Sequence, residues 1–229
     1  MVTRGEDLAP YLFSCTNPVA FTGAGISYAS GLPVFSSYWK GRPLLEWLTL
    51  EQWSRDPLGF YQLYWDQMIH WPGAEPNAAH KTLAALGCLV ITQNFDGLHQ
   101  KAGSRRVLEL HGNLVRLRCH RCEVRYPSID FVGNLQPSCP VCRDLLRPDL
   151  VLAGEPTQNW WAAVHAVEHC DLLLVVGTSL DFRPANRLPE LAERAGAQVI
   201  VVNRSAEAIL PHAWQLCGAT GYGSFTRLT

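Results

Sequence analysis

The chain has 229 residues, of which 48% are hydrophobic and 17% are charged, and its formal net charge is -1. This composition excludes a disordered chain and gives no general basic field for nucleic acid or an anionic membrane surface. The N-terminus lacks the basic-then-apolar order of a signal peptide, and no uncharged apolar run approaches the roughly 18 residues that span a bilayer. We therefore expect a cytoplasmic, monomeric protein with no membrane partner.

Short apolar runs rich in β-forming residues recur along the chain, and each ends in glycine or polar residues. They occupy residues 19–22, 88–92, 107–110, 150–152, 172–176 and 199–202. Nearly continuous apolar strands are typical of a parallel sheet covered on both faces. Predicted helices at 78–86, 160–169 and 187–195 lie between these runs and give an α/β alternation. Because ligands bind beyond the carboxyl ends of such strands, the polar residues there predict a site.

Two segments interrupt this alternation. Residues 38–71 are rich in aromatic side chains, and residues 115–147 carry four cysteines and several prolines. We interpret both as insertions that form a smaller domain across a cleft from the sheet. The predicted division is a Rossmann-like parallel-sheet domain of residues 1–37, 76–114 and 148–229, with a helical module of 38–75 and a zinc-ribbon module of 115–147.

The four cysteines of the second insertion form two Cys-x-x-Cys pairs, which are Cys119 with Cys122 and Cys139 with Cys142. This spacing predicts one structural zinc ion, because four thiolates fill a tetrahedron and leave no position for water or substrate. Disulfides are the alternative, which a reducing compartment disfavours. His120 is interpreted as exposed and not a ligand. The other cysteines, Cys15, Cys88, Cys170 and Cys217, are interpreted as buried small residues.

A glycine pair, Gly23-Ala24-Gly25, follows the first predicted strand. Such a pair lets a phosphate approach backbone N–H groups, although Tyr28 stands where a third glycine would complete a dinucleotide fingerprint. The alternative is a tight turn without a ligand. Neutral Asn203 ends another strand where dehydrogenases carry an acidic residue. With Gly177-Thr178-Ser179 at a third strand end, these residues suggest NAD bound in a manner unlike that of a dehydrogenase.

His111 follows a short predicted strand and is a candidate general base, because imidazole accepts a proton near neutral pH. A lone histidine is more often a packing residue, but Asn94 and Asp96 at a neighbouring strand end favour a catalytic role. His80 and His99 are interpreted as helix-surface or packing residues. Four arginines, Arg116, Arg118, Arg121 and Arg125, are the only candidate for binding nucleic acid, and we interpret them as a solvated face without specific nucleic-acid binding.

Several motifs occur together in one order along the chain. They are Gly-Ala-Gly-Ile-Ser (23–27), Pro76-Asn77-x-x-His80, Thr-Gln-Asn-Phe-Asp-Gly-Leu-His (92–99), His-Gly-Asn (111–113), the two Cys-x-x-Cys pairs, Leu146-Arg147-Pro148 leading to Gly154-Glu155, Gly-Thr-Ser-Leu (177–180) and Val-Asn (202–203). This order resembles the sirtuin family of NAD-dependent protein deacylases across roughly residues 10 to 217.

The resemblance implies that NAD and an acyl-lysine peptide enter a cleft from opposite sides and yield nicotinamide, lysine and O-acyl-ADP-ribose. It implies His111 as the base that activates a ribose hydroxyl, with Asn94 and Asp96 also catalytic. The residues implied to bind the cofactor are Gly23, Ala24, Gly25, Phe35, Gln93, Asn94, Asp96, Gly177, Thr178, Ser179, Asn203 and Cys217. Those implied to bind the substrate are Val151, Gly154, Glu155, Tyr61 and Tyr64, with the Asp181-Phe182-Arg183 loop as the other side of the peptide clamp.

The chain departs from the family pattern at several positions. Val34 and Ser36 replace the usual Asp and Arg, which predicts weaker NAD binding or slower turnover. Tyr61 and Tyr64 have no accompanying arginine, so neutral acyl groups are expected over succinyl. Aromatic residues of the first insertion form either an acyl tunnel or simply a core. Alternative functions are ADP-ribosyl transfer or NAD hydrolysis, and an inactive module that binds NAD or an acyl-peptide.

Overall fold

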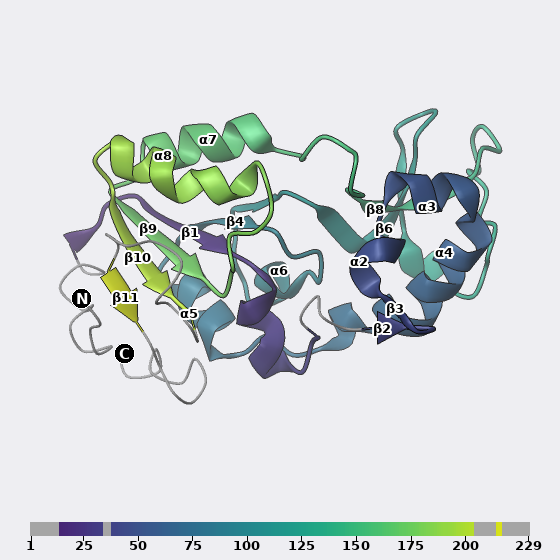
Figure 1. Cartoon of the computed structure of the whole chain (residues 1–229), viewed down its shortest axis with the longest axis horizontal. Coiled ribbons are helices and arrows are strands. Elements are labelled where there is room, and N and C mark those ends of the chain that lie inside the picture. Colours follow the sequence, from purple (N-terminus) through teal and green to yellow (C-terminus); the bar gives the residue numbers. More distant parts are fainter. Residues whose placement is uncertain (1–13, 34–37, 204–213, 217–229) are drawn as a thin grey trace.

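The computed structural model describes residues 14–33, 38–203 and 214–216, which form two lobes side by side (Figure 1). The larger lobe contains a six-stranded parallel sheet in the order β11-β10-β9-β1-β4-β5. The strands are β1 (Pro18–Thr22), β4 (Leu89–Thr92), β5 (Val107–Glu109), β9 (Leu172–Val176), β10 (Gln198–Val202) and β11 (Trp214–Leu216). The predicted α/β class with a Rossmann-like parallel sheet is thereby confirmed.

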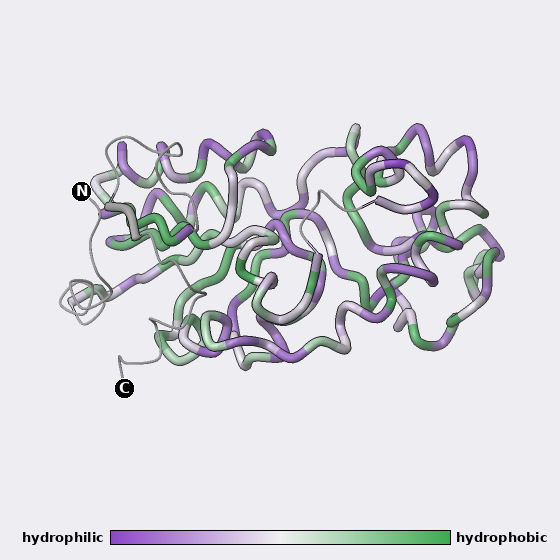
Figure 2. Tube along the Cα trace, turned by 60° about the horizontal axis from the view of Figure 1, so that its bottom comes forward, coloured by the Kyte–Doolittle hydropathy of each residue, from purple (hydrophilic) through white to green (hydrophobic). Residues whose placement is uncertain are grey.

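Both faces of this sheet are covered, as the continuous apolar strands predict. Successive strand residues alternate between the faces: Phe21 and Leu173 pack toward α7 and α8, whereas Ala20 and Leu174 pack toward α5. Figure 1 shows α7 and α8 above the sheet and α5 below it, and the strands carry the hydrophobic colour in Figure 2. The helices of this lobe are η2 (Ala24–Ser30), α5 (Ala78–Ala85), α6 (Leu98–Lys101), α7 (Trp160–Glu168), η6 (Ala185–Arg187) and α8 (Leu188–Arg194).

Side-chain caps fix where several helices begin. The Asn77 side chain accepts a hydrogen bond of 3.0 Å from the Ala79 N–H at the start of α5. Asp56 accepts one of 2.9 Å from the Gly59 N–H at the start of α4, where Pro57 takes the first helical position. The predicted helices at 78–86, 160–169 and 187–195 are confirmed, with ends that differ by one residue.

The smaller lobe combines the aromatic insertion with the cysteine-bearing segment around one core. A three-stranded antiparallel sheet in the order β7-β6-β8 packs against short helices. Its elements are β2 (Tyr38–Trp39), β3 (Arg42–Pro43), α2 (Leu44–Trp47), α3 (Leu50–Arg55), α4 (Pro57–Leu63), the π-helical turn η3 (Tyr64–Met68), η4 (Trp71–Gly73), β6 (Gly112–Cys119), β7 (Arg125–Pro127), η5 (Ser128–Phe131) and β8 (Leu146–Leu150). Trp39, Trp47, Phe60 and Trp65 are buried in this core and Trp53 packs against it, so these rings form a core.

The prediction of a strand at residues 150–152 is wrong. Strand β8 ends at Leu150 and pairs antiparallel with β6, in the sheet of the smaller lobe. Its preceding residues, Arg147 and Asp149, are charged yet buried, so the strand does not resemble an apolar run. Asp149 pairs with Arg116 on β6, and Arg147 pairs with Glu155 on the loop after β8. Such partners compensate the buried charges and cannot be read from local sequence.

Among the residues that the structure describes, no helix has the length and apolar character needed to cross a membrane.

Candidate active site

The carboxyl ends of β1, β4, β9 and β10 meet at one edge of the large sheet. The Gly25 N–H donates to the Gly177 carbonyl at 2.8 Å, and the Gly177 N–H donates to the Val202 carbonyl at 3.0 Å. A Cβ atom on Gly25 would lie 2.7 Å from the Gly177 oxygen, so only glycine allows this approach. The glycine pair after β1 therefore brings two strand ends into backbone contact.

Polar side chains connect these strand ends. The Thr178 hydroxyl donates to Gln93 Oε1 at 2.8 Å, and Asn203 Nδ2 donates to the Thr178 carbonyl at 2.8 Å. The remaining amide nitrogen of Gln93, Nε2, is buried and has no hydrogen-bond partner within the described ranges. A buried donor left in this state is costly unless a ligand satisfies it.

Asp96 and Asn94 meet at the hydroxyl of Ser27. The Ser27 hydroxyl donates to Asp96 Oδ2 at 2.7 Å and accepts from Asn94 Nδ2 at 3.1 Å. Burial raises the pKa of the Asp96 carboxyl, while the Leu98 N–H and the Ser27 hydroxyl oppose this by donating to it. Asn94 Oδ1 is buried and has no partner in the described part of the chain.

Those three side chains line a pocket whose apolar wall was not foreseen from sequence. Trp71 stacks on Phe95 with ring centroids 5.8 Å apart and an interplanar angle of 10°. Phe95 lies between the predicted catalytic residues Asn94 and Asp96, which follow β4, but nothing in the sequence pairs it with a ring 24 positions earlier. The same pocket includes Ala24, which follows β1.

Two buried histidines, His80 and His99, lie next to the hydroxyl groups of Ser27 and Thr22. His80 Nε2 lies 3.4 Å from the Ser27 hydroxyl, and His99 Nε2 lies 2.9 Å from the Thr22 hydroxyl. Burial lowers the pKa of His80 to about 4 and, together with the neighbouring His80, that of His99 to about 3. The rings are 4.9 Å apart and both are neutral at pH 7. The helix-surface interpretation of these histidines is thus wrong and the packing interpretation is right.

His111 follows β5 and is held by backbone contacts. Its Nδ1 lies 3.0 Å from the Gln93 carbonyl oxygen. A carbonyl only accepts, so Nδ1 carries the proton and Nε2 keeps its lone pair. Burial lowers the pKa of His111, which keeps this lone pair available at neutral pH.

The residue after His111 must be glycine. Gly112 has a φ of +84°, and a Cβ atom there would lie 1.9 Å from the Asp149 carbonyl oxygen. Asp149 is also the centre of an ion-pair network, with Arg116 Nε at 3.0 Å and Arg125 Nε at 2.8 Å. Arg116 reaches Glu109 at 2.6 Å as well, which joins β5 of the larger sheet to the smaller one.

Three predicted substrate residues, Val151, Gly154 and Glu155, lie together on the loop after β8. The Val151 N–H donates to the His111 carbonyl at 3.0 Å. Both Glu155 oxygens lie 2.9 Å from Arg147 Nη2, and Oε2 also accepts from the Leu152 N–H at 2.8 Å. This loop is therefore attached to His111 at one end and to β8 at the other.

The prediction that Tyr61 and Tyr64 contact substrate is wrong. Both side chains are fully buried in the core of the smaller lobe. The Tyr61 hydroxyl donates to the Leu146 carbonyl at 2.7 Å, and that of Tyr64 donates to the Leu114 carbonyl. Burial raises both pKa values, that of Tyr64 to about 12. The family resemblance implies a substrate role for them, whereas each hydroxyl connects a helix to a strand.

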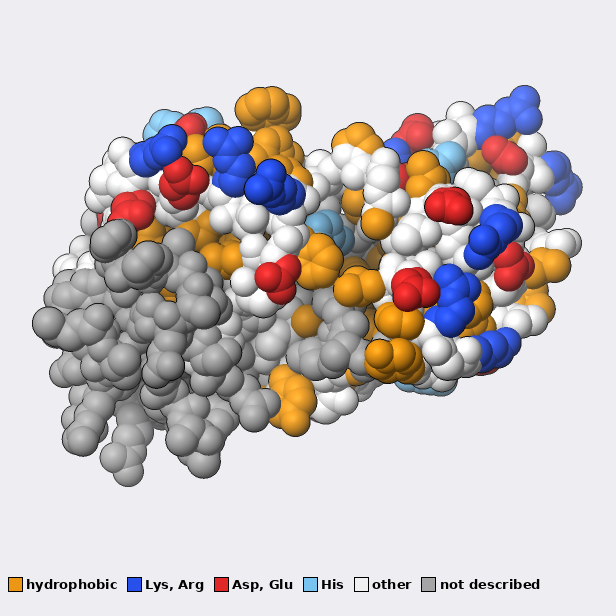
Figure 3. Space-filling model, in the orientation of Figure 1, with side chains coloured by type: hydrophobic (Ala, Val, Ile, Leu, Met, Phe, Trp, Pro, Cys, Tyr) orange, Lys and Arg blue, Asp and Glu red, His pale blue; other side chains and the backbone are white. Residues whose placement is uncertain are grey.

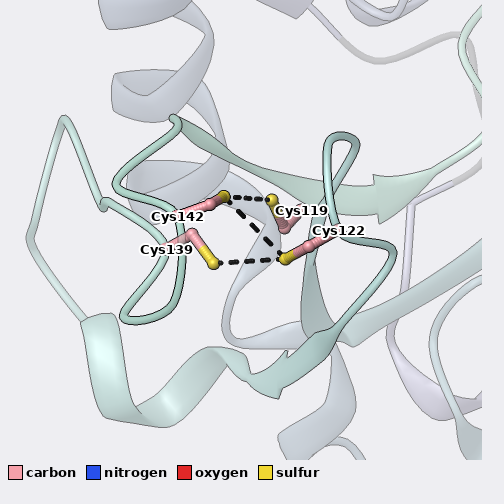
Figure 4. Close-up of side chains that lie close together, drawn as sticks. All are labelled: Cys119, Cys122, Cys139 and Cys142. Carbon is pink, nitrogen blue, oxygen red and sulfur yellow. Dashed lines mark hydrogen bonds between the residues drawn. The ribbon is translucent and has the colours of Figure 1, made fainter.

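The side chains of the four cysteines of the second insertion point toward one another (Figure 4). Their Sγ atoms all lie within 4.8 Å of one another, with Cys119 to Cys142 at 3.4 Å and Cys122 to Cys139 at 3.5 Å. All four are free thiols, which contradicts the disulfide alternative. A metal–sulfur distance of about 2.3 Å places tetrahedral sulfur atoms about 3.8 Å apart, close to this arrangement. His120 is exposed, as predicted.

Some predicted residues lie outside the described part of the chain. They are Phe35 and Cys217 among the cofactor-binding residues, and Val34 and Ser36 among the departures from the family pattern. Ser179 is described and exposed at the end of β9. Cys88 and Cys170 are buried, as interpreted, whereas Cys15 is half-buried.

The converging glycine loops and the separate cysteine cluster define a nucleotide-binding α/β protein with a metal-ligating module. Residues 23–184 match the model of the Sir2 family. The chain belongs to this family, the sirtuins.

Known relatives cover most of the chain. It is 40% identical over 211 residues to an NAD-dependent protein deacetylase of Saccharolobus solfataricus, covering 86% of this chain and 85% of the relative. It is 45% identical over 195 residues to an NAD-dependent protein deacylase of Aeropyrum pernix, covering 81% and 80%. A crystal structure of a Sir2 homologue with NAD has a TM-score of 0.90 at 31% identity, covering 99% of this chain and 93% of that chain. A mutant Sir2 homologue with 2′-O-acetyl ADP ribose has a TM-score of 0.88 at 33% identity, covering 97% and 94%.

Proposed function

We propose that this chain is an NAD-dependent protein-lysine deacylase that releases nicotinamide and O-acyl-ADP-ribose. The relatives carry deacetylase and deacylase names, and similar structures hold NAD or acetylated ADP-ribose. The observation that carries the proposal is the position of His111, whose Nδ1 is bonded to the Gln93 carbonyl, next to the strand end that bears Asn94 and Asp96. A neutral base and two polar groups beside a nucleotide-type loop are what acyl transfer to a sugar hydroxyl needs.

The site fits NAD on two counts. Gly23 and Gly25 let the loop after β1 pack directly against Thr178 and Gly177, so the start of η2 lies at the strand ends where a phosphate is proposed to bind. Gln93 Nε2 and Asn94 Oδ1 are buried and lack partners within the described residues, so a sugar or carboxamide can complete them. The residues proposed to hold NAD are Gly23, Ala24, Gly25, Phe35, Gln93, Asn94, Asp96, Gly177, Thr178, Ser179, Asn203 and Cys217.

NAD supplies a cleavable bond between nicotinamide and ribose, and the ribose hydroxyls that accept the acyl group. His111 Nε2 is proposed to take the proton of such a hydroxyl, because the tautomer set by Gln93 leaves its lone pair available. The Asp96 carboxylate, oriented by Ser27 and the Leu98 N–H, favours positive character nearby. Trp71 and Phe95 form the apolar wall that limits access of water to this pocket.

The substrate is proposed to be an acyl-lysine protein or peptide bound along Val151, Gly154 and Glu155. Neutral acyl groups are expected over succinyl, because the helical insertion contains no Tyr-x-x-Arg pair, and its best match, residues 61–64, ends in tyrosine. Incubation of the pure protein with NAD and matched acetyl-, fatty-acyl- and succinyl-lysine peptides, read by mass spectrometry, tests this. A clear succinyl preference contradicts the acyl-group assignment.

Product analysis separates the alternative activities. O-acyl-ADP-ribose supports deacylation, whereas ADP-ribosylated protein or free ADP-ribose without loss of the acyl group supports transfer or NAD hydrolysis. Absence of nicotinamide release above background indicates an inactive binding module, which the replacements Val34 and Ser36 motivate.

One structural zinc ion per chain is proposed for Cys119, Cys122, Cys139 and Cys142, whose sulfur geometry fits a tetrahedral site. All four ligand positions are sulfur, so the ion would contribute to folding and take no part in catalysis. We also retain the two-domain division at residues 1–37, 76–114 and 148–229 against 38–75 and 115–147, a monomeric state and a cytoplasmic location as proposals from the sequence.

A further inference from the structure

A second hollow lies beside the loop that carries Glu155. Its volume is about 530 Å³, and its lining includes Glu155, Pro156, Trp160, Trp161 and Arg183. Small-ligand pockets span about 300–1,000 Å³, so this space admits an aromatic side chain.

One wall of the hollow is the start of α7, which presents two neighbouring tryptophans differently. Trp160 is half-buried and packs against the core on the α7 and α8 face of the sheet. Trp161 is 80% exposed, and large hydrophobic side chains stand out over the end of α7 nearest the smaller lobe (Figure 3). A tryptophan is highly buried on average in folded proteins, so one this exposed beside a hollow offers a contact surface.

The start of α7 is hydrogen-bonded to the segment at the end of β5, directly before His111. Asn159 Nδ2 donates to the Glu109 carbonyl at 2.9 Å, and the Gln158 N–H donates to the Leu110 carbonyl at 3.1 Å. Both acceptors lie directly before His111 in the sequence. The same backbone segment, residues 109 and 110, therefore contacts the wall of the hollow and leads into His111.

Two charged side chains, Glu155 and Arg183, line the hollow. Arg183 is exposed and forms no salt bridge within the described ranges. The Glu155 carboxylate is matched by the Arg147 guanidinium at 2.9 Å. An acidic group is the complement of the remaining cation.

We infer that this hollow is a specificity subsite for an aromatic side chain of the acyl-lysine peptide, followed or preceded by an acidic residue that faces Arg183. The inference rests on the proposed function, because the Val151–Glu155 loop and the Asp181–Arg183 loop are the proposed sides of the peptide clamp. Both sides reach the hollow, through Glu155 and Arg183. An extended peptide between them places side chains on alternating faces, so one flanking side chain enters the hollow.

The test compares peptides that share one acyl-lysine. One series has alanine at every flanking position, and the other carries a Phe-Asp or Asp-Phe pair scanned along both flanks. The wild type is expected to favour one scanned position about tenfold in kcat/KM, because an aromatic contact and an exposed charge pair would act together there. Trp161→Ala is expected to remove most of this preference while leaving the all-alanine peptide within about twofold. Arg183→Gln is expected to remove the part of the kcat/KM preference that requires Asp in the peptide. In the wild type, that part should weaken as the salt concentration rises.

Ile129→Ala is the matched control, because Ile129 is a 72% exposed hydrophobic residue on η5 in the smaller lobe. It should leave both series unchanged. No scanned preference in the wild type, or an equal loss for both series in Trp161→Ala, overturns the subsite. The subsite is also overturned if sedimentation shows that Trp161→Ala loses self-association while its discrimination between the two peptide series is unchanged.

Calorimetric affinities for the same peptides separate this inference from the proposed function. If wild-type protein binds the aromatic peptide more tightly through Trp161 but turns over neither series, the subsite stands and the deacylase proposal fails. If both series are turned over with equal affinity and rate, the deacylase proposal stands and the subsite fails.

Discussion

Nδ1 of His111 lies 3.0 Å from the backbone carbonyl oxygen of Gln93, so the residue after β4 sets the tautomer of the ring after β5. Backbone geometry thereby fixes which nitrogen can accept a proton. The contact also explains why the candidate base and the Asn94 and Asp96 side chains occupy one strand end, since Gln93 immediately precedes Asn94.

Replacement of His111 by alanine should lower the rate of deacylation by about 10²–10⁴-fold, the range for loss of a general base. The fold should persist, because the ring is only half-buried at the edge of the sheet. Mass spectrometry of the products measures the rate of deacylation, and the midpoint of thermal unfolding shows whether the fold persists. His120→Ala, at an exposed histidine nine residues further on, is the control. Full activity in His111→Ala contradicts the assignment.

The pH dependence of kcat/KM should show an acid limb below 6.5, the ordinary pKa of a histidine. Burial lowers the pKa of His111, so the neutral ring persists to more acidic pH than in solution. An acid limb that falls above pH 6.5 and follows His111 would show that the charged ring is stabilised instead.

The neutral histidine pair should make folding sensitive to acid. The pKa of His80 is about 4 in the folded state, against 6.5 as its ordinary value. Between these values the unfolded chain binds a proton that the folded chain does not, so stability falls as pH decreases from 6.5 toward 4. The slope is about 1.4 kcal/mol per pH unit for this one group. Denaturant unfolding at several pH values measures it, and His80→Asn should flatten the slope in this window.

Removal of metal should destabilise the smaller lobe. Cys119→Ser, or a strong chelator, is expected to lower the free energy of unfolding by several kcal/mol, since metal binding contributes directly to folding. Native mass spectrometry should show about one zinc ion per wild-type chain. Cys15→Ser, at a half-buried cysteine outside the cluster, is the matched control and should keep its metal. Unchanged thermal stability of metal-free protein argues against a structural ion.

Glu155→Gln should raise the KM for an acyl-peptide more than it lowers kcat. The substitution leaves Arg147, which is 7% exposed at its side chain, without its carboxylate partner, and this costs about 3 kcal/mol or more. The Val151–Glu155 loop then loses its tie to β8. Glu46→Gln breaks an exposed pair with Arg42 at 3.3 Å and should change neither constant. Equal changes of KM and kcat in the two variants would contradict the proposal that Glu155 positions the loop that binds the peptide.

The sequence was sufficient for five strands of the parallel sheet, because they are short apolar runs whose pattern does not depend on distant partners, but it did not predict β11. The polar ends of β1, β4, β9 and β10 were predicted for the same reason. The sequence did not predict the contacts that hold the site residues in place where these contacts join residues far apart in the chain. Ser27 and His80 are 53 positions apart, and each alone reads as an ordinary helix residue.

Buried charge was the second source of error. Arg147 and Asp149 lie within β8, where charged residues argue against a buried strand unless their partners are known. Tyr61 and Tyr64 were assigned to the substrate from their spacing, although spacing does not reveal that each hydroxyl bonds to a backbone carbonyl.

Strand β5 belongs to the six-stranded sheet and β6 to the three-stranded one, and only Leu110 and His111 separate them. The proposed proton acceptor therefore lies where the chain passes from one sheet to the other. Its imidazole is bonded to the Gln93 carbonyl after β4, whereas the next residue, Gly112, begins β6, so the angle between the two sheets at this point bears directly on the orientation of the ring.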